Sequence, residues 1–132
     1  MPRSRLPPSI LVLAPPGEEG DELFADLARR EDVCLLRVAT PSAASVAVRE
    51  VPVALFIAGP ELPAASLDAV LAQLDAIRPG TPALAIRARQ SEEPPAWAAR
   101  NVGVLRLPLL PGVLSRSVDV VLGMKRPHEK GN

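Results

Sequence analysis

Residues 62–88 read LPAASLDAVLAQLDAIRPGTPALAIRA, and they contain one complete step from a helix to a strand. Apolar residues recur at helical spacing over 66–77, where Ser66 is expected to cap the helix and Pro79-Gly80 to end it. The run Ala83–Ile86 that follows is apolar at every position, as in a strand buried on both faces. The helix is predicted to turn one stripe inward, made of Leu67, Val70, Leu71, Leu74 and Ile77.

The same alternation extends to both sides of this stretch. Short apolar runs predict further strands at 10–13, 33–38, 53–58 and 102–107. Amphipathic or proline-started segments predict helices at 18–30, 41–49, 92–100 and 112–122, with Thr40 as a cap and Pro41 at the first helical position. Five strands alternating with five helices predict an α/β, flavodoxin-like (βα)5 three-layer sandwich. Its parallel sheet is expected to have the strand order 2-1-3-4-5.

The length and the composition indicate one globular domain. With 132 residues the chain is of single-domain size. We place the domain at 9–123, an N-terminal tail at 1–8, and a C-terminal tail or linker at 124–132. No apolar run approaches the roughly 20 residues of a membrane helix, and Ile10–Leu13 is too short for a signal-peptide core. We therefore expect a cytoplasmic protein with no membrane contact.

Charge and residue usage exclude several classes of function. Fifteen basic and fifteen acidic residues give a formal net charge of zero, which argues against direct nucleic-acid contact by this domain. Cys34 is the single cysteine, so an internal disulfide and a cysteine-based zinc site are ruled out, and we expect Cys34 to be buried in its strand. A hydrolase triad is improbable because the one histidine, His128, lies in the predicted tail and no Gly-x-Ser-x-Gly elbow is present. We expect no enzyme activity.

Residues 9–125 resemble the receiver domain of bacterial two-component response regulators. The resemblance rests on 62–88 and on VGVLRLPLLPGVLSRSVDVVL at 102–122, where a strand ends in a residue–proline pair before the last helix. It implies a cis bond before Pro108 and an aromatic switch position at Val104. It also implies the positions of the five side chains that a receiver domain uses to become phosphorylated.

None of those five groups is present at the implied positions. The acid pair that would hold Mg²⁺ falls on Ala14 and Pro15, and the phosphoacceptor aspartate falls on Gly59. The Ser/Thr position falls on Arg87 and the Lys position on Leu107. The chain therefore resembles an atypical pseudo-receiver, and we expect no catalytic residue, metal or cofactor.

The resemblance implies a phosphorylation-independent regulatory module that acts in signal transduction through protein–protein interaction. Its partner would be another protein or a second copy of this chain. The face through which receivers commonly dock is formed by the fourth helix, fifth strand and fifth helix. In this sequence that face would draw on Trp97, Arg100, Arg106, Leu114, Arg116 and Val120.

Two residues leave alternatives open. Arg87 is expected at the end of the fourth strand, where it could bind an anion or nucleotide, together with Arg89, and make the domain a small-ligand sensor. The plainer interpretation has Arg87 reaching from the strand end to pair with a nearby acid. Trp97 could anchor a partner or pack in the core, and we favour the core.

Overall fold

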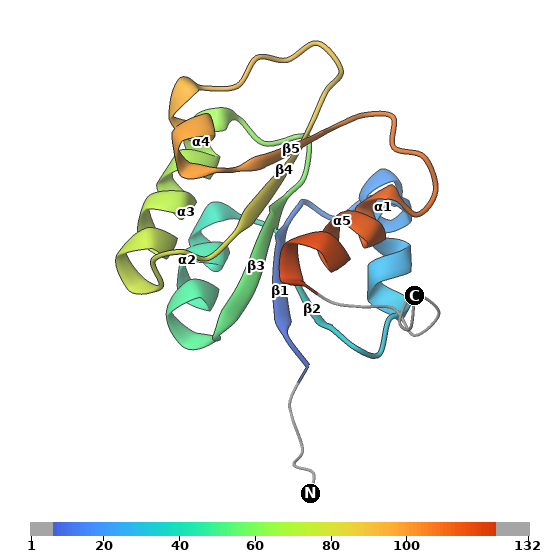
Figure 1. Cartoon of the computed structure of the whole chain (residues 1–132), viewed down its shortest axis with the longest axis horizontal. Helices are drawn as coiled ribbons and strands as arrows, with labels where there is room; N and C mark the ends of the chain where they lie inside the picture. Colours follow the sequence, from blue (N-terminus) through green and yellow to red (C-terminus); the bar gives the residue numbers. More distant parts are fainter. Residues whose placement is uncertain (1–6, 124–132) are drawn as a thin grey trace, which may run out of the picture.

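The computed structural model describes residues 7–123, in which five strands and five helices alternate along the chain (Figure 1). The predicted tail at 124–132 and residues 1–6 of the predicted N-terminal tail lie outside the described residues. The strands are β1 (Ser9–Leu13), β2 (Cys34–Val38), β3 (Val53–Ala58), β4 (Ala83–Arg87) and β5 (Gly103–Arg106). The helices are α1 (Glu18–Arg29), α2 (Pro41–Glu50), α3 (Ala64–Ile77), α4 (Pro95–Arg100) and α5 (Val113–Leu122).

All four strand pairings are parallel, and the strand order is β2-β1-β3-β4-β5. This confirms the predicted flavodoxin-like α/β fold. The sheet is the middle of three layers. Helices α2, α3 and α4 cover one face, and α1 and α5 cover the other (Figure 1).

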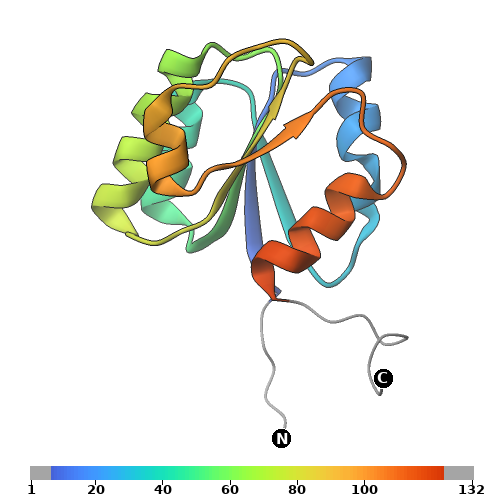
Figure 2. The same ribbon diagram turned by 45° about the horizontal axis from the view of Figure 1, so that its top comes forward.

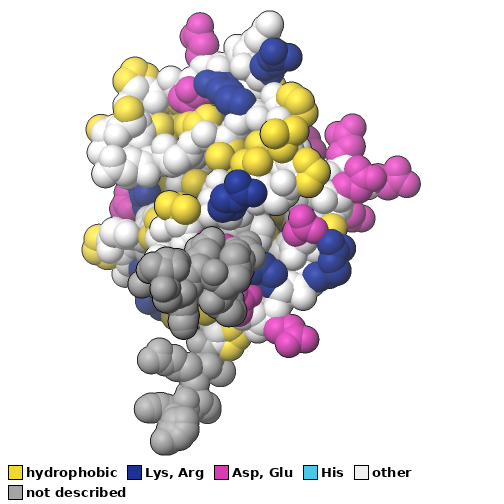
Figure 3. All heavy atoms as spheres, turned by 45° about the vertical axis from the view of Figure 1, so that its right-hand side comes forward, with side chains coloured by type: hydrophobic (Ala, Val, Ile, Leu, Met, Phe, Trp, Pro, Cys, Tyr) yellow, Lys and Arg dark blue, Asp and Glu magenta, His cyan; other side chains and the backbone are white. Residues whose placement is uncertain are grey.

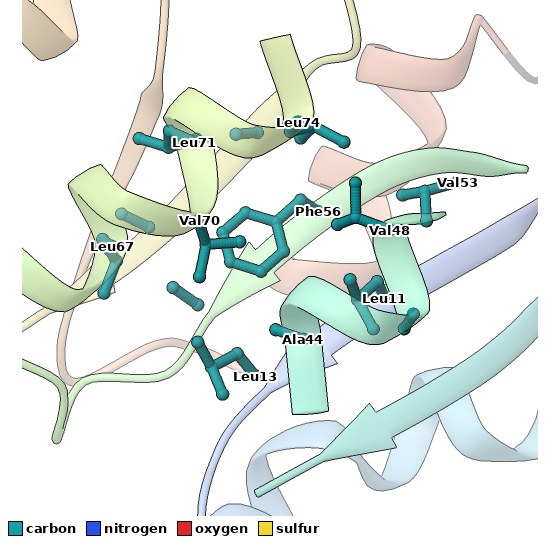
Figure 4. Packing of buried hydrophobic residues seen from close by; sticks show 14 of the residues in the cluster. Leu11, Leu13, Ala44, Val48, Val53, Phe56, Leu67, Val70, Leu71 and Leu74 are labelled. Atoms are coloured by element: carbon teal, nitrogen blue, oxygen red, sulfur yellow. The ribbon is translucent and has the colours of Figure 1, made fainter. Parts of the chain in front are cut away.

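Each strand divides its side chains between two cores, because successive residues of a strand point to opposite faces. In β1, Leu11 and Leu13 belong to the core beneath α2 and α3, whereas Ile10 and Val12 belong to the core beneath α1 and α5. Phe56 of β3 lies in the centre of the first core, between the two helices (Figure 4). The near-continuous apolar strands of the sequence follow from this burial on both faces.

Several local predictions are confirmed. Thr40 caps α2, since its Oγ1 accepts a hydrogen bond from the Ala43 N–H at 3.1 Å, and Pro41 takes the first helical position. Trp97 packs in the core and is 2% exposed. Within residues 7–123, no helix combines the length and the apolar character needed to cross a membrane.

Other local predictions were wrong at the ends of elements. Helix α3 begins at Ala64 after Pro63, so Ser66 lies inside the helix and does not cap it. Ile77 is 39% exposed, because it lies in the last turn of α3, beyond the edge of the core. Cys34 is exposed, because β2 is an edge strand and Cys34 is its first residue.

Candidate functional site

The loops that follow the carboxyl ends of the strands form the place where ligands bind in folds of this type. This end of the sheet is turned forward in Figure 2, where the β1–α1, β3–α3, β4–α4 and β5–α5 connections lie together. The five positions implied by the receiver resemblance all lie in or beside these connections, as expected from their places in the sequence.

Two of the positions that the resemblance implies for acids, residues 14 and 59, are buried and hold an alanine and a glycine. Ala14 is 2% exposed, and its N–H donates to the Val38 carbonyl at 2.9 Å. Gly59 is buried, and its N–H donates to the Leu13 carbonyl at 2.9 Å. A Cβ at Gly59 would lie 3.1 Å from the Ala14 Cβ and 3.3 Å from Glu61 Oε1. Any side chain at residue 59 would therefore force its neighbours to move.

Arg37 is a cationic side chain of this end of the sheet whose role sequence reasoning missed. From the edge strand β2 its Nη2 donates to the Pro15 carbonyl at 2.5 Å and its Nε to the Ala14 carbonyl at 3.3 Å. Its Nη1 pairs with Asp21 Oδ1 at 2.7 Å, and its Cζ lies 5.7 Å from the centre of the Phe24 ring. One guanidinium thus holds the β1–α1 loop. The signal for it was a single charge in an otherwise apolar strand.

A cavity of about 270 Å³ lies beside these positions. Its polar lining comes from the carboxylates of Glu19 and Glu61, and no basic side chain lines it. Such a lining repels a phosphoryl group and other anions. Within residues 7–123, no group of three or more His, Cys, Asp or Glu side chains is placed to hold a metal ion.

Arg87 does not line that cavity, although it ends β4 as predicted. The residue is 9% exposed, its Nη1 donates to the Leu62 carbonyl at 2.9 Å, and its Cζ lies 5.4 Å from the centre of the Trp97 ring. The expected ion pair with a nearby acid was wrong, because none of the ion pairs of the described residues includes Arg87. Arg89, its predicted companion, is exposed.

The end of β5 shows the features that the resemblance implies for Pro108. The Leu107–Pro108 peptide bond is cis. Leu107, at the position of the receiver lysine, packs against the core beneath α1 and α5, and its N–H donates to the Arg87 carbonyl at 3.0 Å. Val104, at the aromatic switch position, packs partly buried against the other core. These side chains are apolar and offer nothing to a phosphoryl oxygen.

The residues of the expected docking face have different environments. Trp97 and Leu114 are buried. Arg100 pairs with Asp75, and Arg106 pairs with Glu93 and donates to Ser91. Two residues of the set are exposed on α5: Arg116 and Val120, the latter 76% exposed.

Helix α5 is fixed by an ion pair on its inner side. Asp119 is 6% exposed, and its Oδ1 accepts from Arg30 Nη2 at 2.7 Å. Arg30 also pairs with Asp32 and donates to Ser115 Oγ at 2.8 Å. The hydrogen bond with Asp32, and then the pairing with Asp119, raise the pKa of the Arg30 guanidinium above its ordinary value. Asp119 and Ser115 therefore join the inner side of α5 to the end of α1.

Comparison with known proteins finds similar solved structures. No protein-family profile and no curated protein matches the sequence. Among solved structures, the signal receiver domain of a protein named as a Luxo repressor from Vibrio parahaemolyticus is similar, with a TM-score of 0.74 at 20% identity. The match covers 89% of this chain and 92% of that one.

The chain has the fold of a signal receiver domain. Two further structures share the fold. One is a pilus assembly-related protein from Burkholderia pseudomallei, with a TM-score of 0.67, 17% identity, and coverage of 90% of this chain and 92% of that one. The other is a pilus assembly protein from Burkholderia thailandensis, with a TM-score of 0.57, 21% identity, and coverage of 89% and 99%.

Proposed function

We propose that this chain is a regulatory module of the pseudo-receiver type, which acts in signal transduction through contacts with other proteins and without being phosphorylated. The observation that carries the proposal is the lack of space for a side chain at residue 59, where an added Cβ would lie 3.1 Å from the buried Ala14 Cβ, at the place where a receiver needs carboxylates. A phosphoryl acceptor requires a nucleophilic side chain, and Mg²⁺ prefers oxygen ligands. Neither Gly59 nor Ala14 supplies one.

The electrostatics support the same proposal. A phosphoryl group on a strand-end aspartate is stabilised by a metal ion and by cationic or hydroxyl side chains around it. Here the adjacent cavity presents Glu19 and Glu61, while the cations Arg37 and Arg87 are directed to backbone carbonyls. The same considerations lead us to propose that the module is not an enzyme.

Fluorine NMR with beryllofluoride and Mg²⁺ tests this part of the proposal. We expect no bound-fluoride resonance with this chain, and no mass increase after incubation with acetyl phosphate. A conventional receiver domain that carries its aspartate serves as the positive control. A bound beryllofluoride signal that disappears in a Glu61→Gln variant would refute the proposal, because Glu61 supplies the carboxylate nearest to Gly59 among the cavity residues.

The contact surface that we propose lies on α5. A groove of about 310 Å³ there is lined by Leu84, Val113, Arg116, Ser117, Val120 and Val121. Leu84, which lines the groove, lies close to Gly103 of the edge strand β5, where an added Cβ would be 2.7 Å from Leu84 Cδ2. The face turned forward in Figure 3 carries a band of hydrophobic side chains with a few basic ones among them. Exposed apolar area of this kind marks interaction sites.

Two of the similar structures are named for pilus assembly, and we take these names as support for a role of this chain in protein contacts. We propose that the partner is a protein with an apolar contact residue for the α5 groove, and that a second copy of this chain is the first candidate.

Sedimentation of the purified chain over a range of concentrations tests the contact surface. If copies associate through the groove, Val120→Asp should shift the mass to that of a monomer, because it places a charge in an apolar interface. Val46→Asp is the matched control, since Val46 is 43% exposed on α2, on the opposite face of the sheet. Equal effects of the two substitutions would contradict a specific role for α5.

The small-ligand sensor is the second candidate. It is favoured by one observation: Arg87 is buried, and its Nε has no hydrogen-bond partner among the described residues. An anion that reached the guanidinium would satisfy that donor, and since Nε is buried in the structure, binding would require the Arg87 side chain to move. The sensor predicts that a nucleotide or phosphorylated metabolite raises the melting temperature, and that Arg87→Ala abolishes the effect. The absence of stabilisation by every anion in a broad screen would exclude it.

A further inference from the structure

The indole of Trp97 lies between an anion and a cation. Its Nε1–H donates to Asp68 Oδ1 at 2.7 Å, and the guanidinium carbon of Arg87 lies 5.4 Å from the centre of the ring. The three side chains come from α3, α4 and β4. Trp97 is 2% exposed and Arg87 9%, whereas Asp68 is exposed on α3. A surface carboxylate and a buried guanidinium are thus joined by one aromatic side chain.

This arrangement offsets the cost of burying the positive charge of Arg87. A buried cation is costly unless a compensating charge or hydrogen-bond acceptors surround it. Arg87 has the Leu62 carbonyl as a hydrogen-bond acceptor and makes no ion pair within residues 7–123. The face of an aromatic ring carries partial negative charge and its edge partial positive charge. In Trp97 the cation faces the ring and the anion meets the N–H edge, so both contacts have the favourable sign.

We propose that Asp68, Trp97 and Arg87 form an ion pair transmitted through the indole, and that this latch fixes α4 on the body of the domain. The hydrogen bond from the indole to a carboxylate increases the electron density of the ring, so the interaction with Arg87 becomes stronger when Asp68 is charged. The proposal does not depend on the phosphorylation state of the domain or on the α5 surface.

The rest of α4 explains why its position depends on this latch. The helix has six residues, and Trp97 is its one buried residue. Its other polar links come from Arg100, whose Nη2 donates to Asp75 Oδ1 at 2.6 Å and to the Thr81 carbonyl at 2.9 Å, and the Asp75 side chain is 45% exposed. Asp68 and Asp75 are seven residues apart, so they lie on one face of α3 and hold Trp97 and Arg100 in the same order. The Asp75 link is expected to be weak because exposed pairs contribute little.

A double-mutant cycle tests the latch. The variants are Asp68→Asn, Arg87→Met and the two combined, and the unfolding equilibrium constant is measured by urea titration of each. We expect the two effects to be non-additive by a factor of about 3 to 10 in that constant, the range of a partly buried cation–π contact. Asp75→Asn combined with Arg87→Met is the matched control. It should be additive, because Asp75 contacts Arg100 and not the indole.

The same cycle in a Trp97→Phe background separates this mechanism from direct attraction. Phenylalanine keeps an aromatic face for Arg87 but has no N–H for Asp68, so the coupling should disappear. Coupling that persists in this background would show that the two charges interact directly, and would overturn the proposal. Additivity in the wild-type background would overturn it as well.

Fluorescence gives a second measurement that does not need the Arg87 variants to fold. Trp97 is the single tryptophan, so its emission reports on α4 alone. Asp68→Asn should increase acrylamide quenching by about twofold, because α4 then opens more often. Asp26→Asn, which removes an exposed partner of Arg29 on α1, should leave the quenching unchanged. A Trp97 that stays equally shielded in Asp68→Asn would refute a latch on α4.

Discussion

Replacement of Arg30 by alanine should destabilise the domain more than replacement of its partner Asp119. Arg30 follows α1, and its guanidinium bridges Asp32 beside it and Asp119 on α5. The side chain of Arg30 is 16% exposed and that of Asp119 is 8% exposed. Arg30→Ala removes the hydrogen bonds to Asp32, Asp119 and Ser115 together, whereas Asp119→Ala leaves Arg30 paired with Asp32.

The expected losses in the free energy of unfolding follow from the contacts that each substitution removes. Removing one partner of a buried ion pair costs about 3–5 kcal/mol when the other charge stays buried. Losing one charge-assisted hydrogen bond costs about 1.5–3 kcal/mol. We therefore expect Arg30→Ala to lower the free energy of unfolding by about 3–4 kcal/mol, and Asp119→Ala by about 2 kcal/mol. The double variant Arg30→Met/Asp119→Leu should be near neutral, because it removes both desolvated charges together.

Urea titration followed by circular dichroism measures all three variants on one scale. The order of the effects matters more than their size, since it depends on which charge remains buried. If Asp119→Ala costs as much as Arg30→Ala, then Asp32 does not hold the arginine and the reasoning fails. A double variant that is as unstable as the worse single variant would show that packing, and not charge, explains the loss.

Three further substitutions test local features of the fold. Thr40→Ala should lower the free energy of unfolding by about 1 kcal/mol, since it removes the side-chain cap of α2, and thermal melting would show it. Gly103→Ala should lower the free energy of unfolding by about 1–3 kcal/mol in urea titration, because its Cβ would lie 2.7 Å from Leu84 Cδ2. An unchanged free energy of unfolding would show that β5 shifts to make room for the methyl group. Gly20→Ala should displace the tip of Arg37, which lies 2.5 Å from the added Cβ, and weaken amide protection in the β1–α1 loop measured by hydrogen exchange.

The alternation of strands and helices and the two-sided burial could be predicted from short apolar runs separated by helical spacing. The strand order could be predicted because such units adopt a known flavodoxin-like arrangement. The prediction was weakest at element ends, where a single residue decides the boundary. Ser66 has the chemistry of a cap, yet the fixed backbone of Pro63 starts α3 earlier. Cys34 has an apolar preference, yet its strand lies at the edge of the sheet, a position that the residue itself does not reveal.

The candidate site could be predicted only as a set of missing groups. The receiver resemblance places Ala14 and Gly59 where carboxylates would be needed, and in the structure both residues are buried. What replaces those groups could not be predicted, because it depends on contacts between residues that are distant in sequence. Arg37 reaches the β1–α1 loop 22 residues earlier, and the Arg87–Trp97–Asp68 contact joins three elements.

The contacts of Arg37 and Arg87 with the strand-end loops have one physical feature in common, a positive charge that belongs to the chain itself. A receiver that gathers carboxylates at the strand ends needs a bound cation to offset their repulsion, so its loops depend on a metal ion and on phosphorylation. Here the acids are absent, and arginines fixed in the chain supply the positive charge to the same loops. Arg37 binds the carbonyls after β1, and Arg87 binds the Leu62 carbonyl after β3. Because such cations are part of the chain and cannot dissociate, we propose that these loops keep one arrangement and that the domain signals through what binds it.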